Sequence, residues 1–206
     1  MFIPRHPVVE NQFCSYSAQT ATAAAGIGGV IAYAGSVVFL DSAAVNQEPI
    51  VKKMSYTDRA GVPFGFLMQK VKTGYHQVHP AGYYVPGDLG SSDVIAQPSY
   101  NGAGVITGTK AVPVGVAHLG IWDTVHYTSL GGAAAATALL PGDSLYAACD
   151  NAKVTNGGVG DNDNDSAGEY CNATVVARVV KGASAAKASA NINNTTLYPI
   201  RIKLLI

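Results

Sequence analysis

Turn-forming residues interrupt this chain at short and regular intervals, and this punctuation limits the folds that it can form. Across residues 81–130, apolar and β-branched runs are separated by the turn-rich sequences PGD, GSS, PSYNGAG and TGT. Runs of about four to eight residues suit strands and are too short for stable helices. The sequence therefore predicts an all-β fold with little helix, a single β-sandwich or β-barrel domain.

Two strand patterns stand out in the first half of the chain. In residues 28–41, β-branched and aromatic side chains flank Gly35–Ser36, which predicts a hairpin with its turn at that pair. Further on, Phe64, Phe66 and Met68 alternate with Gly65, Leu67 and Gln69. That period of two predicts a core strand.

The second half ends in a similar pattern. Pro141, Gly142 and Asp143 form a turn sequence before a strand-like run, and residues 173–182 predict another strand. The last residues alternate Ile and Leu with Arg201 and Lys203, which predicts a terminal strand. Residues 131–140 have helix-forming composition over only about two turns, so a short helix and a loop both remain open.

Two segments are predicted to lie outside the β-rich body. Residues 1–20 contain Pro4 and Pro7, which interrupt backbone hydrogen bonding, so we expect an extended N-terminal arm that contacts a neighbouring subunit instead of pairing in its own sheet. Residues 156–168 are the most polar and glycine-rich in the chain and predict an exposed loop. The remaining organisation is one β-rich domain over residues 21–206, which carries that loop.

The charge balance limits the possible partners. The chain has 13 Lys and Arg against 13 Asp and Glu, a net charge of zero. A nucleic-acid-binding protein usually carries a basic excess, so we expect no nucleic-acid partner. No apolar run approaches the roughly 18 residues that predict a transmembrane helix, and the N-terminal residues lack a signal-peptide pattern, so we expect no membrane partner.

Low charge also bears on assembly. Only 13% of residues are charged while 48% are hydrophobic, which is less charge than a free monomer usually keeps on its surface. Surface covered by copies of the same chain accounts for that composition. We therefore expect a homotrimer or a similar cyclic oligomer.

No motif places a nucleophile beside a base. The chain has no G-x-S-x-G sequence, and the pair His76 and His79 lacks the helical spacing and adjacent Glu of a zinc protease. Gly26, Gly28 and Gly29 make only part of a phosphate-binding fingerprint. We therefore predict no enzyme activity, no catalytic residue and no cofactor, and interpret the histidines as surface or strand-packing residues: His6, His76, His79, His118 and His126.

Two sets of residues leave alternatives open. Asp161, Asp163 and Asp165 alternate with Asn and offer oxygen ligands of the kind calcium prefers, but the EF-hand pattern fails at Ser166 and Asn172. A solvated loop is favoured over a calcium site, and no metal is predicted. The three cysteines, Cys14, Cys149 and Cys171, cannot all pair with one another, and free buried thiols are favoured over a bond between Cys149 and Cys171.

The middle of the chain, about residues 63–155, resembles the capsid decoration (cement) proteins of tailed phages. The resemblance is carried by four segments: FGFLMQKV (64–71), AGYYVPGDLG (81–90), PVGVAHLGIWDT (113–124) and PGDSLYAACDNAKVT (141–155). It implies a small β-rich, β-tulip-like domain that binds the outside of the shell, commonly as a trimer. This chain departs from that pattern in its long Asp/Asn loop and long termini.

The resemblance implies a structural virion protein that decorates and stabilises an icosahedral capsid. It would be assembled in the host cytoplasm, have the major capsid protein as its partner and lie on the outer capsid surface. One alternative from another class is a carbohydrate-binding or adhesin-like β-sandwich module of a head fibre, since tyrosines, 11 in number, can stack on sugars. An enzyme and a tail-tube or minor virion protein are further alternatives.

Overall fold

Short strands make up the regular structure of this chain. The computed structural model describes residues 2–5, 10–17, 30–42, 49–54, 61–73, 93–96, 98–100, 102–103, 106–109, 111–128, 138–148, 154–155, 174–185 and 198–206. Within these ranges there are strands and turns and no helix, so the prediction of an all-β fold is confirmed. In the same ranges no helix is long and apolar enough to cross a membrane.

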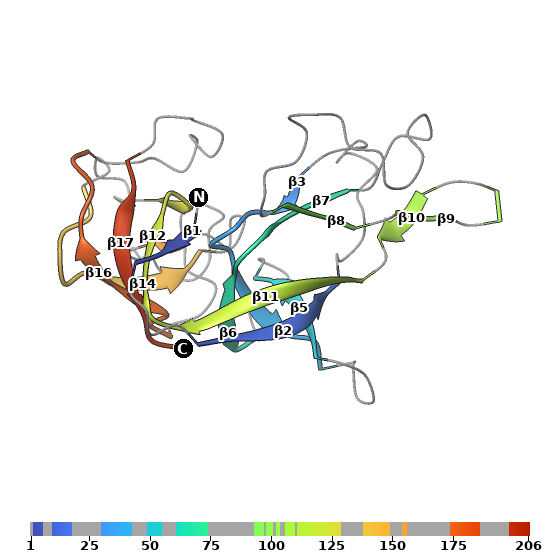
Figure 1. Cartoon of the computed structure of the whole chain (residues 1–206), viewed down its shortest axis with the longest axis horizontal. Coiled ribbons are helices and arrows are strands. Elements are labelled where there is room, and N and C mark those ends of the chain that lie inside the picture. The colour runs from blue at the N-terminus through green and yellow to red at the C-terminus, as the bar shows by residue number, and fades with distance from the viewer. Residues whose placement is uncertain are drawn as a thin grey trace, which may run out of the picture.

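The largest unit is a seven-stranded sheet, called here the large sheet (Figure 1). Its strands, in spatial order, are β1 (Phe2–Pro4), β12 (Ile121–Thr124), β17 (Ile200–Leu204), β16 (Ala177–Lys181), β14 (Ser144–Ala147), β15 (Val154–Thr155) and β13 (Tyr127–Thr128). All neighbours are antiparallel except β13 and β15.

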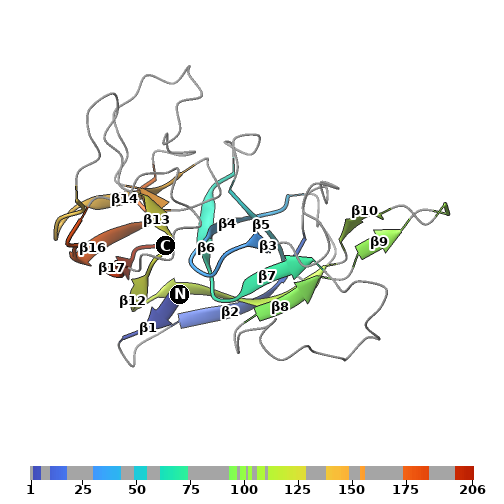
Figure 2. The ribbon, with the colours of Figure 1, turned by 90° about the horizontal axis from the view of Figure 1, so that it is seen from above.

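Five further strands close into a barrel beside the large sheet. In order around the barrel they are β11 (Val112–Leu119), β2 (Glu10–Tyr16), β5 (Ile50–Lys53), β4 (Val37–Leu40) and β6 (Pro63–Leu67). Only β2 and β5 run parallel. A three-stranded sheet of β3 (Val30–Ala32), β7 (Lys70–Thr73) and β8 (Asp93–Ala96) lies next to the barrel, and the pair β9 (Pro98–Tyr100) and β10 (Ile106–Thr109) lies at the end away from the large sheet (Figure 2).

Two antiparallel chain segments pass together from the large sheet into the barrel. On one, β1 is followed by β2; on the other, β11 is followed by β12, and β1 pairs with β12 while β2 pairs with β11. The run of residues 113–124 bends at Gly120, whose φ of +114° favours glycine. The Gly120 carbonyl then accepts the backbone N–H of Leu204 at 3.0 Å, which fixes the bend to β17.

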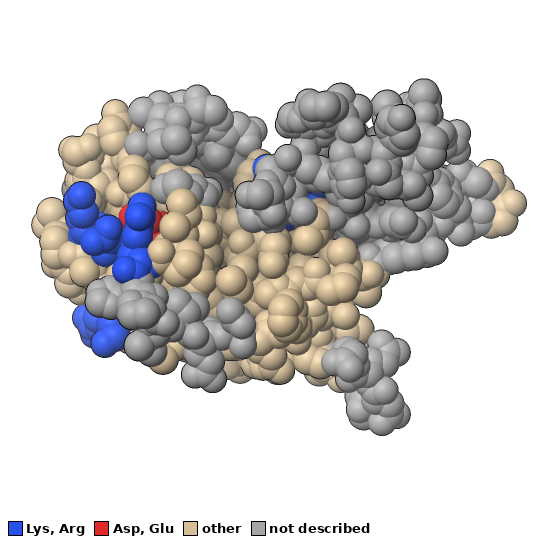
Figure 3. Space-filling model, in the orientation of Figure 1, with Lys and Arg blue, Asp and Glu red and all other residues tan. Residues whose placement is uncertain are grey.

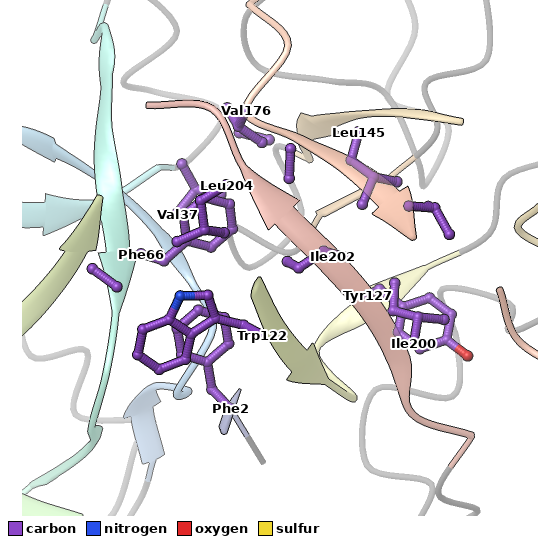
Figure 4. Packing of buried hydrophobic residues seen from close by; sticks show 14 of the residues in the cluster. Phe2, Val37, Phe66, Trp122, Tyr127, Leu145, Val176, Ile200, Ile202 and Leu204 are labelled. Carbon is purple, nitrogen blue, oxygen red and sulfur yellow. The ribbon is translucent and has the colours of Figure 1, made fainter. Parts of the chain in front are cut away.

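The inner face of the large sheet packs on the barrel to make the main core (Figure 4). Phe2 stacks on Trp122 with ring centroids 4.4 Å apart and on Phe66 of the barrel at 5.8 Å. The rest of this cluster includes Val37, Phe39, Met54, Leu145, Val179, Ile200, Ile202 and Leu204. The core therefore unites the two units into one body.

A second apolar cluster fills the barrel and reaches the three-stranded sheet. Neighbouring residues of β4 belong to different clusters, since Val37 packs in the first and Val38 in the second. The second cluster also contains Cys14, Tyr16, Val51, Leu67, Val71, Val114 and Val116. Because β4 is buried on both faces, it lies at the centre of the molecule.

Several strand predictions are confirmed. Residues 63–67 form a core strand, with Phe66 and Leu67 buried on opposite faces. Residues 177–181 and 200–204 are strands, and the buried residues of the second alternate with Arg201 and Lys203. The turn at Pro141–Gly142 closes with a bond from the Asp143 N–H to the Leu140 carbonyl, and Gly142 has φ of +96°.

The predicted extended arm over residues 1–20 is wrong in one respect: its described parts pair within the same chain. Residues 2–4 form the edge strand β1, and residues 10–16 form β2 between β11 and β5. Pro4 is tolerated because an edge strand need not donate on its outer side. Phe2, Cys14 and Tyr16 are buried, so this segment belongs to the core.

The predicted hairpin over residues 28–41 is also wrong, although its turn is present. The Ser36 N–H bonds the Tyr33 carbonyl, and Gly35 has φ of +93°. The flanking strands then separate, with β3 pairing β7 while β4 pairs β5 and β6. Leu67 explains the separation, because its carbonyl accepts the Gly35 N–H and its N–H bonds the Ser36 carbonyl.

We expect Phe2→Ala to lower the free energy of unfolding by about 3–5 kcal/mol, the usual loss for a buried phenylalanine. The matched control is Phe13→Ala on β2, whose side chain is 79% exposed; it should change stability by less than about 0.5 kcal/mol. Urea unfolding measures both. Similar losses in the two variants would contradict the placement of β1 in the core.

Gly65→Ala should destabilise the barrel by roughly 1–3 kcal/mol through overpacking. A Cβ on Gly65 would clash with the Val116 side chain and lie 2.9 Å from the Ala117 carbonyl oxygen. Gly102→Ala is the control, because nothing lies within 4 Å of its Cβ position. Thermal unfolding of the two variants side by side tests the difference, and an unchanged midpoint for Gly65→Ala would refute the packing.

Candidate functional site

The structure places two of the five histidines, and both pack against aromatic rings. His118 lies edge-on to Phe64 with centroids 4.6 Å apart, and His126 lies under Tyr33 at 5.2 Å. Among the described residues, the Nε2 atom of His118 is the one buried side-chain nitrogen or oxygen without a hydrogen-bond partner. The strand-packing interpretation therefore holds for these two, while His6, His76 and His79 lie outside the described residues.

Ser36 and His126 form the arrangement closest to a nucleophile and a base. The Ser36 Oγ and His126 Nε2 atoms are 3.2 Å apart, but Ser36 is completely buried and His126 is buried. The same Oγ accepts the Tyr33 N–H at 3.3 Å, and Thr124 Oγ1 accepts the His126 N–H at 3.0 Å. A nucleophile must reach its substrate, and the burial of Ser36 does not allow this in the observed geometry. Here the contact between Ser36 and His126 joins the barrel to the large sheet.

Cys14 is the cysteine that the structure describes, and it is free and buried in the barrel. Desolvation raises the pKa of its thiol, so the reactive thiolate is disfavoured. The prediction of a free buried thiol is confirmed for Cys14. Cys149 and Cys171 lie outside the described residues.

The calcium alternative falls on residues that the structure does not describe. Asp161, Asp163 and Asp165, with the whole predicted loop over residues 156–168, lie outside the described ranges. Within those ranges no group of three or more His, Cys, Asp or Glu side chains is arranged to hold a metal ion.

An ion cluster on the outer face of the large sheet is the most developed polar arrangement. Asp123 on β12 accepts from Arg5 Nε at 2.6 Å and from Arg201 on β17 through Nε at 2.8 Å and Nη2 at 3.3 Å. Its side chain is 10% exposed, whereas those of Arg5 and Arg201 are 44% and 38% exposed. Hydrogen bonds first from Arg201 and then from Arg5 lower the pKa of Asp123 despite its burial, so the carboxylate stays ionised.

The strand register brings more cations to this face. Asp123 is opposite Arg201, which is opposite Lys181, and Lys203 is opposite Arg178. We call the set of Arg5, Arg178, Lys181, Arg201 and Lys203 the basic face. Figure 3 shows Lys and Arg side chains gathered over the large sheet, with acidic atoms between them. Arg178 is held at the strand end by a bond from Nη1 to the Gly142 carbonyl at 3.3 Å.

Apolar side chains lie among these charges. Ile3 is opposite Asp123 and is 37% exposed, while Val180, at the bulge before Lys181, is 44% exposed. Leu205 continues the outward alternation after Lys203 and is also 44% exposed. Arginine is enriched at protein interfaces, and on this face it lies beside exposed aliphatic side chains.

Sequence reasoning noticed Arg201 and Lys203 but missed the basic face. Arg5 and Asp123 are 118 residues apart, and Arg201 and Asp123 are 78 apart, so no local pattern joins them. The usable signal was the alternation in residues 177–181 and 200–204, which places charges on one side of each strand.

Comparison with known proteins gives no family: no protein-family model matches the chain, and no curated protein matches it.

Asp123→Asn should reduce stability by roughly 1–2 kcal/mol near neutral pH, because hydrogen bonds to a charged group are lost. The lowered pKa means that this contribution is complete above the unfolded-state value of about 3.9 and disappears as the pH falls through the folded-state value. The gap between wild type and variant in urea unfolding should therefore narrow below about pH 4.

The double variant Asp123→Asn with Arg201→Gln tests the pairing directly. It should lose less stability than the sum of the two single variants, because each single change already breaks the shared contact. Two results together would show that the ion cluster does not stabilise the fold. The stability difference between wild type and Asp123→Asn would stay constant down to low pH, and the losses of the two single variants would add up to that of the double variant.

Proposed function

We propose that this protein is a structural virion protein that decorates and stabilises the outer surface of an icosahedral phage capsid. The observation that carries the proposal is the outer face of the large sheet, where exposed cations and aliphatic side chains lie together. Such a surface suits docking on another protein.

The fold supports this role because its barrel and large sheet are joined by a shared core. The barrel and the large sheet share the core around Trp122, and two paired chain segments cross between them. A body that bridges neighbouring shell subunits must transmit load without deforming, and close-packed cores have low compressibility. The joined barrel and sheet therefore form the body that contacts the shell, and the described parts of residues 1–20 belong to its core.

The composition supports assembly with copies of the same chain. Charged residues make up 13% of the sequence, and large apolar side chains are exposed on the barrel as well, among them Phe13 and Val62 at 79% and 71%. Surface of this kind becomes favourable when a second copy covers it. We therefore keep the homotrimer or a similar cyclic oligomer as part of the proposal.

A protein that binds the assembled shell but not its separated subunits stabilises the shell by mass action. Particles that carry the protein should therefore rupture at a higher temperature than particles that lack it. Release of packaged DNA during heating, followed with a DNA-binding dye, measures the rupture temperature. Adding the purified protein back to bare particles should restore the higher value.

Equal rupture temperatures for bare, decorated and restored particles would end the stabilising role. Binding of the purified protein to glycan arrays, without binding to bare particles, would instead support the adhesin-like alternative.

A further inference from the structure

The basic face concentrates positive charge in a chain whose net charge is zero. Its five cations, Arg5, Arg178, Lys181, Arg201 and Lys203, share this face with Asp123, so among these described side chains the cations outnumber the carboxylate by four. We propose that the basic face binds a carboxylate-rich patch on the surface of another protein. The inference rests on the proposed function for the identity of the partner, which is the shell protein. The carboxylate chemistry of the partner is inferred from the basic face alone.

The donors on this face remain available to a partner. Arg5 contacts Asp123 through Nε, which leaves its two terminal nitrogens without a hydrogen bond among the described residues. The side chains of Lys181 and Lys203 are exposed and have no ion-pair or hydrogen-bond partner within the described ranges. Guanidinium groups match carboxylates in a two-point geometry. Arg201 already uses Nε and Nη2 on Asp123, whereas the Asp123 contact orients the Arg5 guanidinium and leaves its terminal nitrogens for a partner.

Exposed aliphatic side chains on the basic face favour carboxylates on a protein over the phosphates of a nucleic acid. Ile3, Val180 and Leu205 offer exposed aliphatic area that a phosphate backbone does not use.

The extent of the face fits a local patch. It covers neighbouring strands β1, β12, β17 and β16, and at about 4.8 Å between strands this is roughly 14 Å. A protein surface with a few clustered Asp and Glu residues can match that width.

The test compares two double variants that remove the same charge. Lys181→Gln with Lys203→Gln changes the basic face and leaves the Asp123 cluster intact, whereas Lys70→Gln with Lys72→Gln makes the same change on β7. Each full-length protein is titrated against bare particles, poly-L-glutamate and a short DNA duplex, and thermal unfolding confirms that the variants fold.

The basic-face variant should bind particles and poly-L-glutamate roughly three- to tenfold more weakly than wild type, as expected for two exposed ion pairs. The β7 variant should bind like wild type. Raising NaCl to about 0.5 M should shrink the difference, because screening shortens the range of the attraction.

The outcomes separate this inference from the proposed function. Normal particle binding by the basic-face variant would overturn the inference and leave the decoration role standing. Loss of poly-L-glutamate binding in that variant, with no wild-type binding to particles, would support the basic face and overturn the decoration role. Wild-type binding to DNA but not to poly-L-glutamate, reduced in the basic-face variant, would assign the face to nucleic acid and overturn the inference.

Discussion

The stack of Phe2, Trp122 and Phe66 is the contact on which the rest of the structure depends. Phe2 comes from the edge strand, Trp122 from its neighbour and Phe66 from the barrel, and the Phe2 ring lies within 7° of parallel to the Trp122 ring and within 9° of the Phe66 ring. The stack lies where both paired segments leave the large sheet for the barrel. Its burial therefore fixes the position of one unit against the other.

The same packing determines the outer face. Side chains of a strand alternate between the two faces, so an inward Trp122 places Asp123 outward and an inward Ile202 places Arg201 and Lys203 outward. A shift of the strand register by one residue would bury these charges against the barrel. The free-energy penalty of burying them would be far larger than the stabilisation from any exposed ion pair. Exposed side chains such as those of Lys181 and Lys203 add little to the stability of the fold.

Local patterns predicted the parts of the fold that depend on neighbours in sequence. The turn at Pro141–Gly142, the core strand around Phe66 and the alternating C-terminal strand all follow from side chains within a few residues. The pairing partners of the strands could not be predicted from local sequence. A tight turn at Gly35 is compatible both with a hairpin and with strands that diverge toward Leu67. The ion cluster required knowledge of those partners, so the sequence could supply Arg201 but not its contact with Asp123.

The buried pair of Ser36 and His126 shows why residue types alone do not establish catalysis. Both groups belong to the junction: Ser36 ends the turn that leads into β4, and His126 follows β12 of the large sheet. A Cβ added to Gly35 in that turn would meet Thr124, His126 and Phe2 within 3.3 Å, so the turn fits closely against the sheet. A hydrogen bond between polar groups enclosed this tightly stabilises the fold, since an unpaired buried donor or acceptor would cost about 1–3 kcal/mol. The Ser36–His126 contact thus pairs buried polar atoms beside the aromatic stack, where the turn before β4 meets the large sheet.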